Sequence, residues 1–530
     1  MQTMKLVLRI GLCLLLGLAS AAIVPALASQ EAAGADFKPI FDGKTLNGWK
    51  SPDMSFWSVE DGAITVRSTE QHIVTANQFL VWQLGELDDF ELKLKYRISG
   101  TPEANSGIQF RSRIEQDGHA VGYQADIDLG GQWVGALYDE QGRGVLAQRG
   151  QKAVSDADGK ITHTSIADAD ALWAGIKKDD WKEYHITARG SHIILKINGK
   201  VTAEVIDNDK QQQDLSGKLA LQLHTGPPLT VQFKDIHLKR LNMSERKKIV
   251  FIAGPVSHDY GSHEHNAGCL LLAKCLNENM PGIFATVYTN GWPKDPTAFD
   301  NTDAIVIFCD GNGGNVALPH FEQLDKLVKK GTGIAFIHYA LTVPKGESGN
   351  YMLNWLGGYY ETFWSVNPTW SAEFKQLPQH PITRGVRPFT INDEWYYHMR
   401  FVEGMKSVTP ILTAIPPDDT RKGPDGAHSG NPQVRARMGV PEHMAWAFQP
   451  PGGGRGFGFT GAHWHWNWAH NDMRKLMLNA LVWIAGVDVP SDGVPSKTPS
   501  IEELEANIDE PKPENWKPEE IGRMIERFNK

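Results

Sequence analysis

The chain has 530 residues, which is too long for one ordinary domain, so we expect two domains with extensions. Hydrophobic residues make up 41% of the chain and charged residues 22%, a composition that supports folded cores and excludes disorder throughout. The formal net charge of -9 argues against nucleic acid or an anionic membrane surface as the main partner.

Residues 1–28 have the pattern of an export signal. Lys5 and Arg9 supply positive charge, an apolar run follows over residues 10–24, and residues 26–28 (ALA) form a small-residue cleavage site. The apolar run is too short for a stable membrane span. We therefore predict a cleaved signal and a periplasmic or secreted mature protein with no membrane span.

Three cysteines remain after this cleavage. Their odd number and wide spacing do not form a disulfide framework, so we interpret them as small packing residues. They are Cys269, Cys275 and Cys309.

Residues 35–241 contain short runs in which apolar and polar residues alternate, separated by Gly, Asp and Asn turns. Helical periodicity is nearly absent, so the pattern predicts an all-β sandwich. The pair Asn198-Gly199 predicts a tight hairpin turn within it.

The stretch 105–128 predicts two strands joined by a turn at Asp117-Gly118. Period-two alternation places Gln109 and Arg111 on one face of the first strand. The second strand carries three polar side chains on one face, namely Gln124, Asp126 and Asp128. If the two polar faces coincide, the sheet presents amides, guanidinium groups and carboxylates that suit a sugar. An ordinary solvated face alternates in the same way, and the pattern alone favours that simpler interpretation.

A later run places a histidine at a strand end. The leucines at 219, 221 and 223 share the core face, so Gln222 and His224 face the other way. Gly and Pro follow directly, which predicts the end of the strand. At that position the His224 side chain can reach a cleft.

Several motifs in this half occur together in order. They are FDGKTLNGW (41–49), NSGIQFR (105–111), GYQADI (122–127), GALYD (135–139), WKEYHITARG (181–190) and the closing run 222–241. Together they resemble the 3-keto-disaccharide hydrolase domain family. The resemblance implies a concanavalin-like jelly-roll sandwich that acts on glycosides oxidised at C3.

A 3-keto group acidifies the C2 proton, so such chemistry needs a base near C2, an acid for the leaving group and a donor for the enolate oxygen. We identify Asp126, Asp128 and His224 as acid and base candidates. Arg111 and Gln109 are the candidates for oxyanion stabilisation. Further substrate-binding candidates are Asn105, Tyr123, Gln124 and Gln222. The family's Tyr-Glu-x-Gln pattern stands here as Tyr-Gln-Ala-Asp at 123–126, so either the carboxylate role has moved along the face or the domain only binds sugar.

Residues 246–490 alternate apolar strand-like runs with helical stretches, which predicts an α/β domain with a largely parallel sheet. Sites in such folds form at the carboxyl ends of the strands. Polar residues gather at those positions in this chain. His258, His263 and His265 follow the first strand, Asp310 follows the third and His338 ends the fourth.

Further motifs in this half are the loop at 254–268, DGNGG (310–314), HPITRGV (380–386), NDEWYYHMR (392–400) and GFGFTGAHWHWNW (456–468). As an ordered set they resemble the trehalose-utilisation (ThuA-like) family, which implies a class I glutamine-amidotransferase-like fold. By that analogy His338 occupies the turn that would carry a Cys nucleophile, which argues against thioester chemistry. We include Asp310, His338 and Glu394 among the substrate-binding candidates.

Two His-x-His units stand in this domain, His263 with His265 and His463 with His465. Extended backbone would put both imidazoles of each unit on one face, where they could bind Zn²⁺ or another divalent ion. Alternatively, the histidines hydrogen-bond to loop backbone or line a polar sugar pocket. The sequence favours the second interpretation, so no cofactor is certain and a divalent metal ion remains possible.

Residues 491–530 are rich in Pro and charged residues. The run from Ser500 to Glu503 is a capping-box pattern for one short helix, and Pro518 begins another. We interpret this segment as an extension that wraps a domain surface.

The sequence thus predicts an exported carbohydrate-active protein that cleaves 3-keto-glycosides, by hydrolysis or by C2 deprotonation and elimination. The expected partner is a small-molecule glycoside or sugar, with no nucleic acid. One alternative is a non-catalytic sugar-binding sandwich joined to a ThuA-like sugar-processing domain. Another is a structural protein of an extracytoplasmic sugar-processing complex.

Overall fold

The computed structural model describes residues 37–176, 180–243 and 245–530. The predicted export signal over residues 1–28 lies outside these ranges. Within them, none of the helices combines the length and the apolar character that a membrane span needs. All three predicted packing cysteines are buried and free, as expected.

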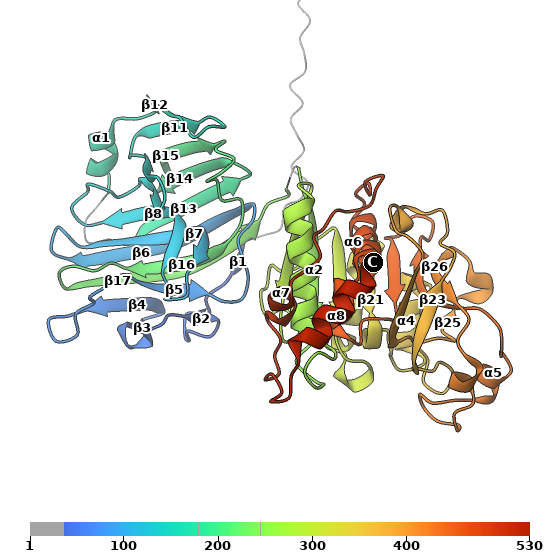
Figure 1. Ribbon diagram of the computed structural model, residues 1–530. Coiled ribbons are helices and arrows are strands. Elements are labelled where there is room, and N and C mark those ends of the chain that lie inside the picture. The colour runs from blue at the N-terminus through green and yellow to red at the C-terminus, as the bar shows by residue number, and fades with distance from the viewer. Residues whose placement is uncertain (1–36, 177–179, 244) are drawn as a thin grey trace, which may run out of the picture. The chain divides into compact units, whose positions relative to one another are not determined.

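The first half of the chain forms two sheets, drawn in blue to green in Figure 1. Among the described residues, the larger sheet has ten strands, with β1 (Lys38–Pro39) paired beside β17. Its other strands run in the order β12 (Ile161–Ser165), β11 (Gln151–Ser155), β15 (Lys200–Asp207), β14 (His192–Ile197), β13 (Lys182–Arg189), β6 (Phe90–Gly100), β17 (Leu229–Arg240), β4 (Ala63–Ser68) and β3 (Trp57–Glu60). The smaller sheet has the order β10 (Gly144–Ala147), β9 (Leu137–Glu140), β8 (Ala120–Asp128), β7 (Asn105–Ile114), β16 (Lys218–Leu223), β5 (Gln78–Trp82) and β2 (Trp49–Lys50).

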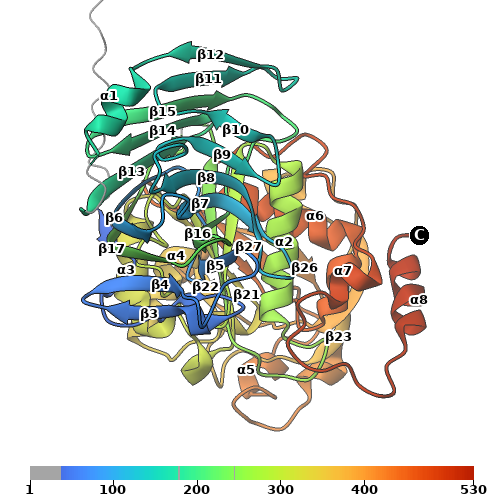
Figure 2. The same cartoon turned by 90° about the vertical axis from the view of Figure 1, so that its left-hand side faces the viewer.

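The two sheets lie face to face (Figure 2), and apolar side chains from both sheets form one core cluster. In β6, for example, every second residue from Phe90 to Ile98 is at most 1% exposed and joins the common core. Asn198 and Gly199 have positive φ angles of 49° and 76° and connect β14 to β15, as a tight type I′ hairpin requires. The predicted all-β sandwich is therefore confirmed. A short helix, α1 (Ala169–Ala174), lies outside the sheets.

The pairing of β7 with β8 sets the geometry of the smaller sheet's outer face. Asn105 lies opposite Asp128, Gly107 opposite Asp126 and Gln109 opposite Gln124. A β-bulge then interrupts the ladder between Gln109 and Arg113, and Arg111 takes a positive φ of 51°. The predicted alternation of the first strand therefore holds only as far as Gln109, because a bulge redirects the side chains that follow.

The second half forms a seven-stranded sheet among the described residues, in green to red in Figure 1. Its order is β19 (Ile283–Tyr288), β18 (Lys247–Ala253), β20 (Ala304–Phe308), β21 (Gly333–Ile337), β28 (Gly456–Phe459), β27 (Glu442–Phe448) and β26 (Val408–Ala414). The strands from β19 to β28 are parallel, and β27 and β26 are antiparallel to their neighbours. Two further pairs lie outside this sheet, β22 (Gly358–Tyr359) with β25 (Arg400–Phe401) and β23 (Thr369–Phe374) with β24 (Phe389–Glu394).

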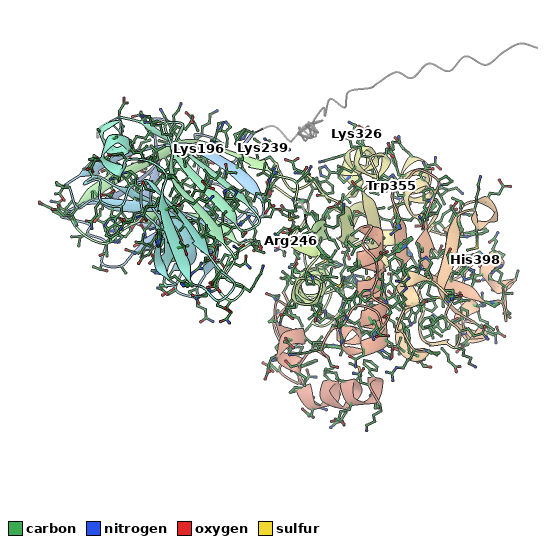
Figure 3. The ribbon with its side chains drawn as sticks, turned by 90° about the horizontal axis from the view of Figure 1, so that it is seen from above. Lys196, Lys239, Arg246, Lys326, Trp355 and His398 are labelled. Carbon is green, nitrogen blue, oxygen red and sulfur yellow. The ribbon has the colours of Figure 1, made fainter. Side chains whose placement is uncertain are left out.

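Helices cover both faces of this sheet, which makes the predicted α/β domain. The apolar side chains of α2 (His265–Asn279) and α6 (Asn471–Ile484) pack in one cluster with one face of the strands. Those of α3 (Phe321–Lys329) and α4 (Glu347–Leu356) pack with the other face, where Trp355, labelled in Figure 3, is buried. Strands and helices alternate up to α4, except that β20 follows β19 directly, and the antiparallel pairs come after α4. One more short helix, α5 (Pro432–Arg435), lies in this part.

The C-terminal extension forms α7 (Ile501–Glu505) and α8 (Pro518–Phe528), as its helix-start signals predict. Ser500 and Glu503 make the expected reciprocal capping box. Leu504 is buried in the same cluster as α2 and α6, and the Trp516 ring lies 4.9 Å from that of Trp466. The extension therefore packs on the α/β domain.

Candidate functional site

A cavity of about 300 Å³ lies on the outer face of the smaller sheet of the sandwich. Four of the predicted site residues line it, namely Asn105, Gln124, Asp126 and His224. Four further residues that the sequence analysis did not select complete the lining, namely Asn77, Trp133, Tyr138 and Glu140. The polar faces of β7 and β8 therefore coincide, and they open into a cavity rather than onto a flat solvated surface.

The floor of this cavity exists because Gly107 has no side chain. A Cβ atom at Gly107 would lie 2.3 Å from the Gln124 side chain, so the Gln124 amide occupies the space above the glycine. There its Nε2 donates to Asp126 Oδ1 at 2.7 Å. Gln109 Nε2 donates in turn to Gln124 Oε1 at 3.0 Å. Gln109 is outside the lining, so it positions Gln124 rather than meeting a ligand.

Asp126 has a strongly perturbed proton affinity. Burial raises the pKa of its carboxyl from 3.8 to about 8, and the charges of Asp128 and Glu140 act in the same direction, while the Gln124 hydrogen bond opposes them. A carboxyl with this pKa exchanges its proton near neutral pH. That property is the one a general acid or base needs, and it favours a functional role for the cavity.

The rim combines aromatic rings with titratable side chains. Trp133 and Tyr138 are partly exposed, and such rings are suited to stacking on a sugar. Burial, with the charges of Glu140 and Asp126, raises the pKa of the Tyr138 phenol, so this hydroxyl stays protonated and can donate. Glu140 Oε1 lies 3.2 Å from His119 Nε2. At the opposite end, His224 Nδ1 donates to the Thr225 carbonyl oxygen, which leaves Nε2 as an acceptor.

Four other predicted residues do not line this cavity. Arg111 follows the bulge and donates to the carbonyl oxygens of Asp88 and Gly190, and its guanidinium pairs with Asp89 at 2.9 Å. It therefore joins parts of the sandwich and is not available for an oxyanion. Tyr123 lies in the core, where its hydroxyl donates to Asp207.

Asp128 and Gln222 also have different environments from those predicted. The Asp128 carboxylate accepts the backbone N–H groups of residues 132, 133 and 134, so it holds the loop that carries Trp133. Gln222 is fully buried on β16 and outside the lining. Neither side chain meets the cavity directly, although Asp128 shapes its rim.

A second cluster lies in the α/β domain, where four side chains meet. They come from the loop before α2, the turn after β21, the end of β24 and the loop after β28, and are His263, His338, Glu394 and His463. One ligand atom from each lies within 4.8 Å of the others. His263 Nε2 is 3.0 Å from His463 Nδ1 and 3.1 Å from His338 Nε2. Glu394 Oε2 is 3.4 Å from both His338 Nε2 and His463 Nδ1.

The hydrogen bonds around this four-residue cluster fix which ring nitrogens carry protons. His338 Nδ1 lies 2.7 Å from the Thr460 carbonyl oxygen, which can only accept, so this nitrogen carries the proton and Nε2 carries a lone pair. His263 Nδ1 lies 3.2 Å from the Asp310 carboxylate, which likewise draws the proton to Nδ1. Two lone pairs therefore face each other across 3.1 Å. A cation between them removes the repulsion.

The cluster fits a tetrahedral metal ion. Nitrogen and oxygen ligands about 2.0–2.1 Å from Zn²⁺ are about 3.3 Å apart at the corners of a tetrahedron, and the separations above lie close to that value. Burial also lowers the pKa of His263 to about 3, which keeps its imidazole neutral as metal binding requires. The carboxylate and carbonyl partners of His263 and His338 are the outer contacts that orient metal-bound histidines.

Local backbone geometry supports a functional assignment for the four-residue cluster. His263 and His338 have φ angles of 50° and 55°, in the left-handed region that residues other than glycine adopt rarely. Both are held by the surrounding fold at sharp turns, His338 directly after β21. His463 is held differently, because the Asp393 carboxylate accepts the backbone N–H groups of Ala462 and His463.

Each predicted His-x-His unit contributes only one ligand to the four-residue cluster. His465 begins a turn of 3₁₀ helix (His465–Ala469), and its Nε2 contacts the Leu504 carbonyl oxygen of the extension at 2.8 Å. His265 begins α2, and its Nδ1 contacts the Pro255 carbonyl oxygen at 3.1 Å. The backbone is helical from the second histidine of each unit, so the two rings diverge. The other two members of the cluster are Glu394 and His338, which the sequence analysis predicted to bind substrate.

The fold and these two sites define a protein with an all-β sandwich followed by an α/β domain, each with its own polar centre. Residues 36–239 match the family described as "3-keto-alpha-glucoside-1,2-lyase-like domain", and residues 256–484 match the family described as "Trehalose utilisation". The chain therefore carries a domain of each family in this order, which confirms both resemblances. Both families are carbohydrate-related.

Solved structures resemble each half at low sequence identity. A putative ThuA-like protein from Bacteroides uniformis is 13% identical, with a TM-score of 0.35, over 47% of this chain and 96% of that one. A putative glycosyl hydrolase from Parabacteroides distasonis is 19% identical, with a TM-score of 0.27, over 39% of this chain and 100% of that one. The carbohydrate-binding module CBM66 from Bacillus subtilis is 13% identical, with a TM-score of 0.26, over 36% and 95%. Among curated proteins, none matches the chain.

Proposed function

We propose that the sandwich cavity cleaves 3-keto-glycosides by removing the proton at C2 and releasing the group bonded to C1. The observation that carries this proposal is Asp126, a carboxyl with a pKa of about 8 on the wall of a cavity with an aromatic rim. The matched family's description, which names a 1,2-lyase of 3-keto-glucosides, supports the same reaction class.

The cavity supplies a group for each step of such an elimination. The Asp126 carboxylate takes the C2 proton, and the electron pair of that C–H bond passes into the enolate of the C3 ketone. The Tyr138 hydroxyl donates to the enolate oxygen. As the enolate collapses, a C1–C2 double bond forms, the C1–O bond breaks and the leaving oxygen takes the proton that Asp126 removed from C2. Trp133 stacks on the sugar ring.

The test is to incubate the mature protein with a chemically oxidised 3-keto-glucoside and separate the products by mass. We expect release of the aglycone together with an unsaturated 3-keto product, or its hydrate. Asp126→Asn should lower turnover by about 10²–10⁴. The control is Asp235→Asn, which removes an exposed carboxylate of β17. Equal turnover in the Asp126 variant and the control would exclude Asp126 from the reaction.

Sugar binding without catalysis is the alternative for the sandwich. It predicts that the wild-type protein binds the 3-keto-glucoside in calorimetry and leaves it intact, as does Asp126→Asn. The raised pKa of Asp126 favours the enzyme, because a binding site for a neutral sugar needs no proton exchange at pH 7.

For the α/β domain we propose a bound divalent metal ion, with Zn²⁺ as the best fit to three imidazoles and one carboxylate. With four protein ligands such a tetrahedral ion would have no open position, so when bound it would stabilise the fold around these side chains. The chain's own contribution is the orientation of the three histidines by Asp310, Thr460 and Asp393. Elemental analysis should find zinc in the wild-type protein and less in Glu394→Gln.

We further propose a periplasmic or secreted location, with residues 1–28 as the cleaved signal, which N-terminal sequencing of the mature protein tests. We also propose the finer fold assignments that the sequence suggests, a concanavalin-like jelly roll for residues 35–241 and a class I glutamine-amidotransferase-like fold for residues 246–490, with residues 491–530 as the extension.

A further inference from the structure

The C-terminal extension, residues 491–530, contacts both chain segments that carry loop histidines of the four-residue cluster. His263 lies in the loop before α2, and His463 lies in the loop after β28. A backbone hydrogen bond joins these two loops, since the His263 N–H donates to the His463 carbonyl oxygen at 2.9 Å. Figure 1 shows α7 of the extension beside α2. The extension therefore lies where it can restrain both loops.

The first contact is a group of three aromatic rings. The Trp516 ring of the extension lies 5.0 Å from that of Tyr260, which belongs to the loop before α2. The same ring lies 4.9 Å from that of Trp466, in the 3₁₀ turn that follows the other loop. Trp516 Nε1 donates to Glu505 Oε1 at 2.6 Å, which fixes the ring relative to α7. One side chain of the extension thus packs against both ligand-bearing segments.

Two hydrogen bonds tie the same segments to the extension at other points. His465 is buried, and its Nε2 donates to the Leu504 carbonyl oxygen at 2.8 Å. At the start of α2, Asn266 Nδ2 donates to Asp509 Oδ2 at 2.6 Å. Both donors stand two or three positions after a histidine of the cluster. Release of the extension would therefore remove a contact from each segment close to a metal ligand.

The four-residue cluster depends on such restraints because its ligands come from four separate segments of the chain. A metal ion binds all four only when their ligand atoms stay within the short distances of its coordination sphere. Loops that are already fixed lose less conformational freedom on binding, so the affinity for the ion is higher.

We propose that the C-terminal extension holds His263 and His463 in position for the metal ion, so that metal binding and docking of the extension strengthen each other. The inference rests on the metal proposal above and is independent of the reaction proposed for the sandwich. Trp516 and Asp509 are positioning residues, since neither belongs to the cluster. The coupling is reciprocal, because the factor by which the docked extension raises zinc affinity equals the factor by which zinc favours docking.

The first experiment measures zinc affinity in the full-length protein. Chelator-treated proteins are titrated with Zn²⁺ in competition with a chelating indicator. Trp516→Ala removes the ring that packs against both segments, and Asp509→Ala, at an exposed position, removes the acceptor for Asn266. Trp292→Ala is the matched control, because it removes a partly buried Trp of the α/β domain that stacks on His320 instead. Circular dichroism checks that each variant is folded.

The second experiment measures the reciprocal effect through hydrogen exchange of backbone amides. In the wild type, zinc should slow exchange in α7 and α8, because it favours the docked extension. In Glu394→Gln, which lacks a cluster carboxylate, the same zinc concentration should slow exchange less. A purely structural role of the extension would leave its exchange independent of zinc.

We expect a zinc dissociation constant at least about 5-fold higher in Trp516→Ala, a smaller increase in Asp509→Ala and an unchanged value in Trp292→Ala. Wild-type zinc affinity in both extension variants would overturn the inference. So would exchange in α7 and α8 of the wild type that zinc does not change. A wild type that binds no zinc would instead refute the metal proposal itself, so the two failures are distinguishable.

Discussion

Asp126→Asn removes the titrating carboxyl of the sandwich cavity, so it tests both the pH dependence of stability and the reaction proposed for the cavity. The pKa of Asp126 is raised in the folded protein, so the folded state holds this proton more tightly than the unfolded chain does. The stabilisation that comes from holding this proton is complete below pH 3.8, the ordinary pKa of the carboxyl. It is lost as the pH rises to about 8. At 1.36 kcal/mol per pKa unit, the difference between a pKa of 3.8 and one of about 8 corresponds to on the order of 5 kcal/mol.

Asparagine has nearly the same shape and does not ionise, so the variant escapes this loss. The difference in unfolding free energy between variant and wild type should therefore shift in favour of the variant by several kcal/mol between pH 4 and pH 9. Denaturant titrations of both proteins across that range measure it, and every other titrating group cancels in the difference. Turnover should fall at the same time. If the unfolding free energies of the two proteins change in parallel with pH, the folded protein does not hold the Asp126 proton more tightly than the unfolded chain. The proposed reaction, which depends on that property, would then be refuted.

Three other substitutions test the remaining structure. Arg111→Met breaks a buried ion pair with Asp89 and should lower the unfolding free energy by about 3–5 kcal/mol in chemical denaturation, while turnover per folded molecule stays unchanged. Loss of turnover in fully folded protein would show that Arg111 takes part in the site. Gly107→Ala should displace the Gln124 amide, cost about 1–3 kcal/mol and lower turnover, whereas Gly282→Ala, where a Cβ meets nothing within 4 Å, serves as its control. Zinc at 100 times its dissociation constant should stabilise the wild type by about 2.7 kcal/mol, measured on the unfolding transition of the α/β domain. The same zinc concentration should stabilise Glu394→Gln by less. Equal stabilisation of the two proteins would argue against Glu394 as a ligand.

The sequence predicted the sandwich site through strand periodicity, and it failed where the periodicity breaks. Alternation from Asn105 to Gln109, and along β8, correctly placed polar side chains over one face. The bulge that turns Arg111 into a buried ion pair leaves no mark in a pattern of apolar and polar residues. Glu140 belongs to the neighbouring strand β9, and only the pairing of β8 with β9 brings it to Asp126. Strand pairing is a tertiary property that a local pattern does not contain.

The histidines of the α/β domain show the same limit. The two His-x-His units indicated a metal site, but the prediction that both histidines of each unit bind the ion assumed an extended backbone. In the fold, His265 and His465 each begin a helical segment, which turns the second ring of each unit away from the first. His338 and Glu394 lie on separate strands' ends, and the sheet brings them to His263 and His463. Placement at the carboxyl ends of strands was the signal that grouped them.

The fate of the C2 proton tests the central claim most directly. A 3-keto-glucoside deuterated at C2 is compared with its unlabelled form, and aglycone release is followed with wild-type protein. Base removal of this proton by Asp126 predicts that the deuterium is absent from the sugar product and that release is slower for the deuterated substrate when this step limits the rate. Release with the deuterium fully retained at C2 would contradict the elimination and indicate direct cleavage at C1.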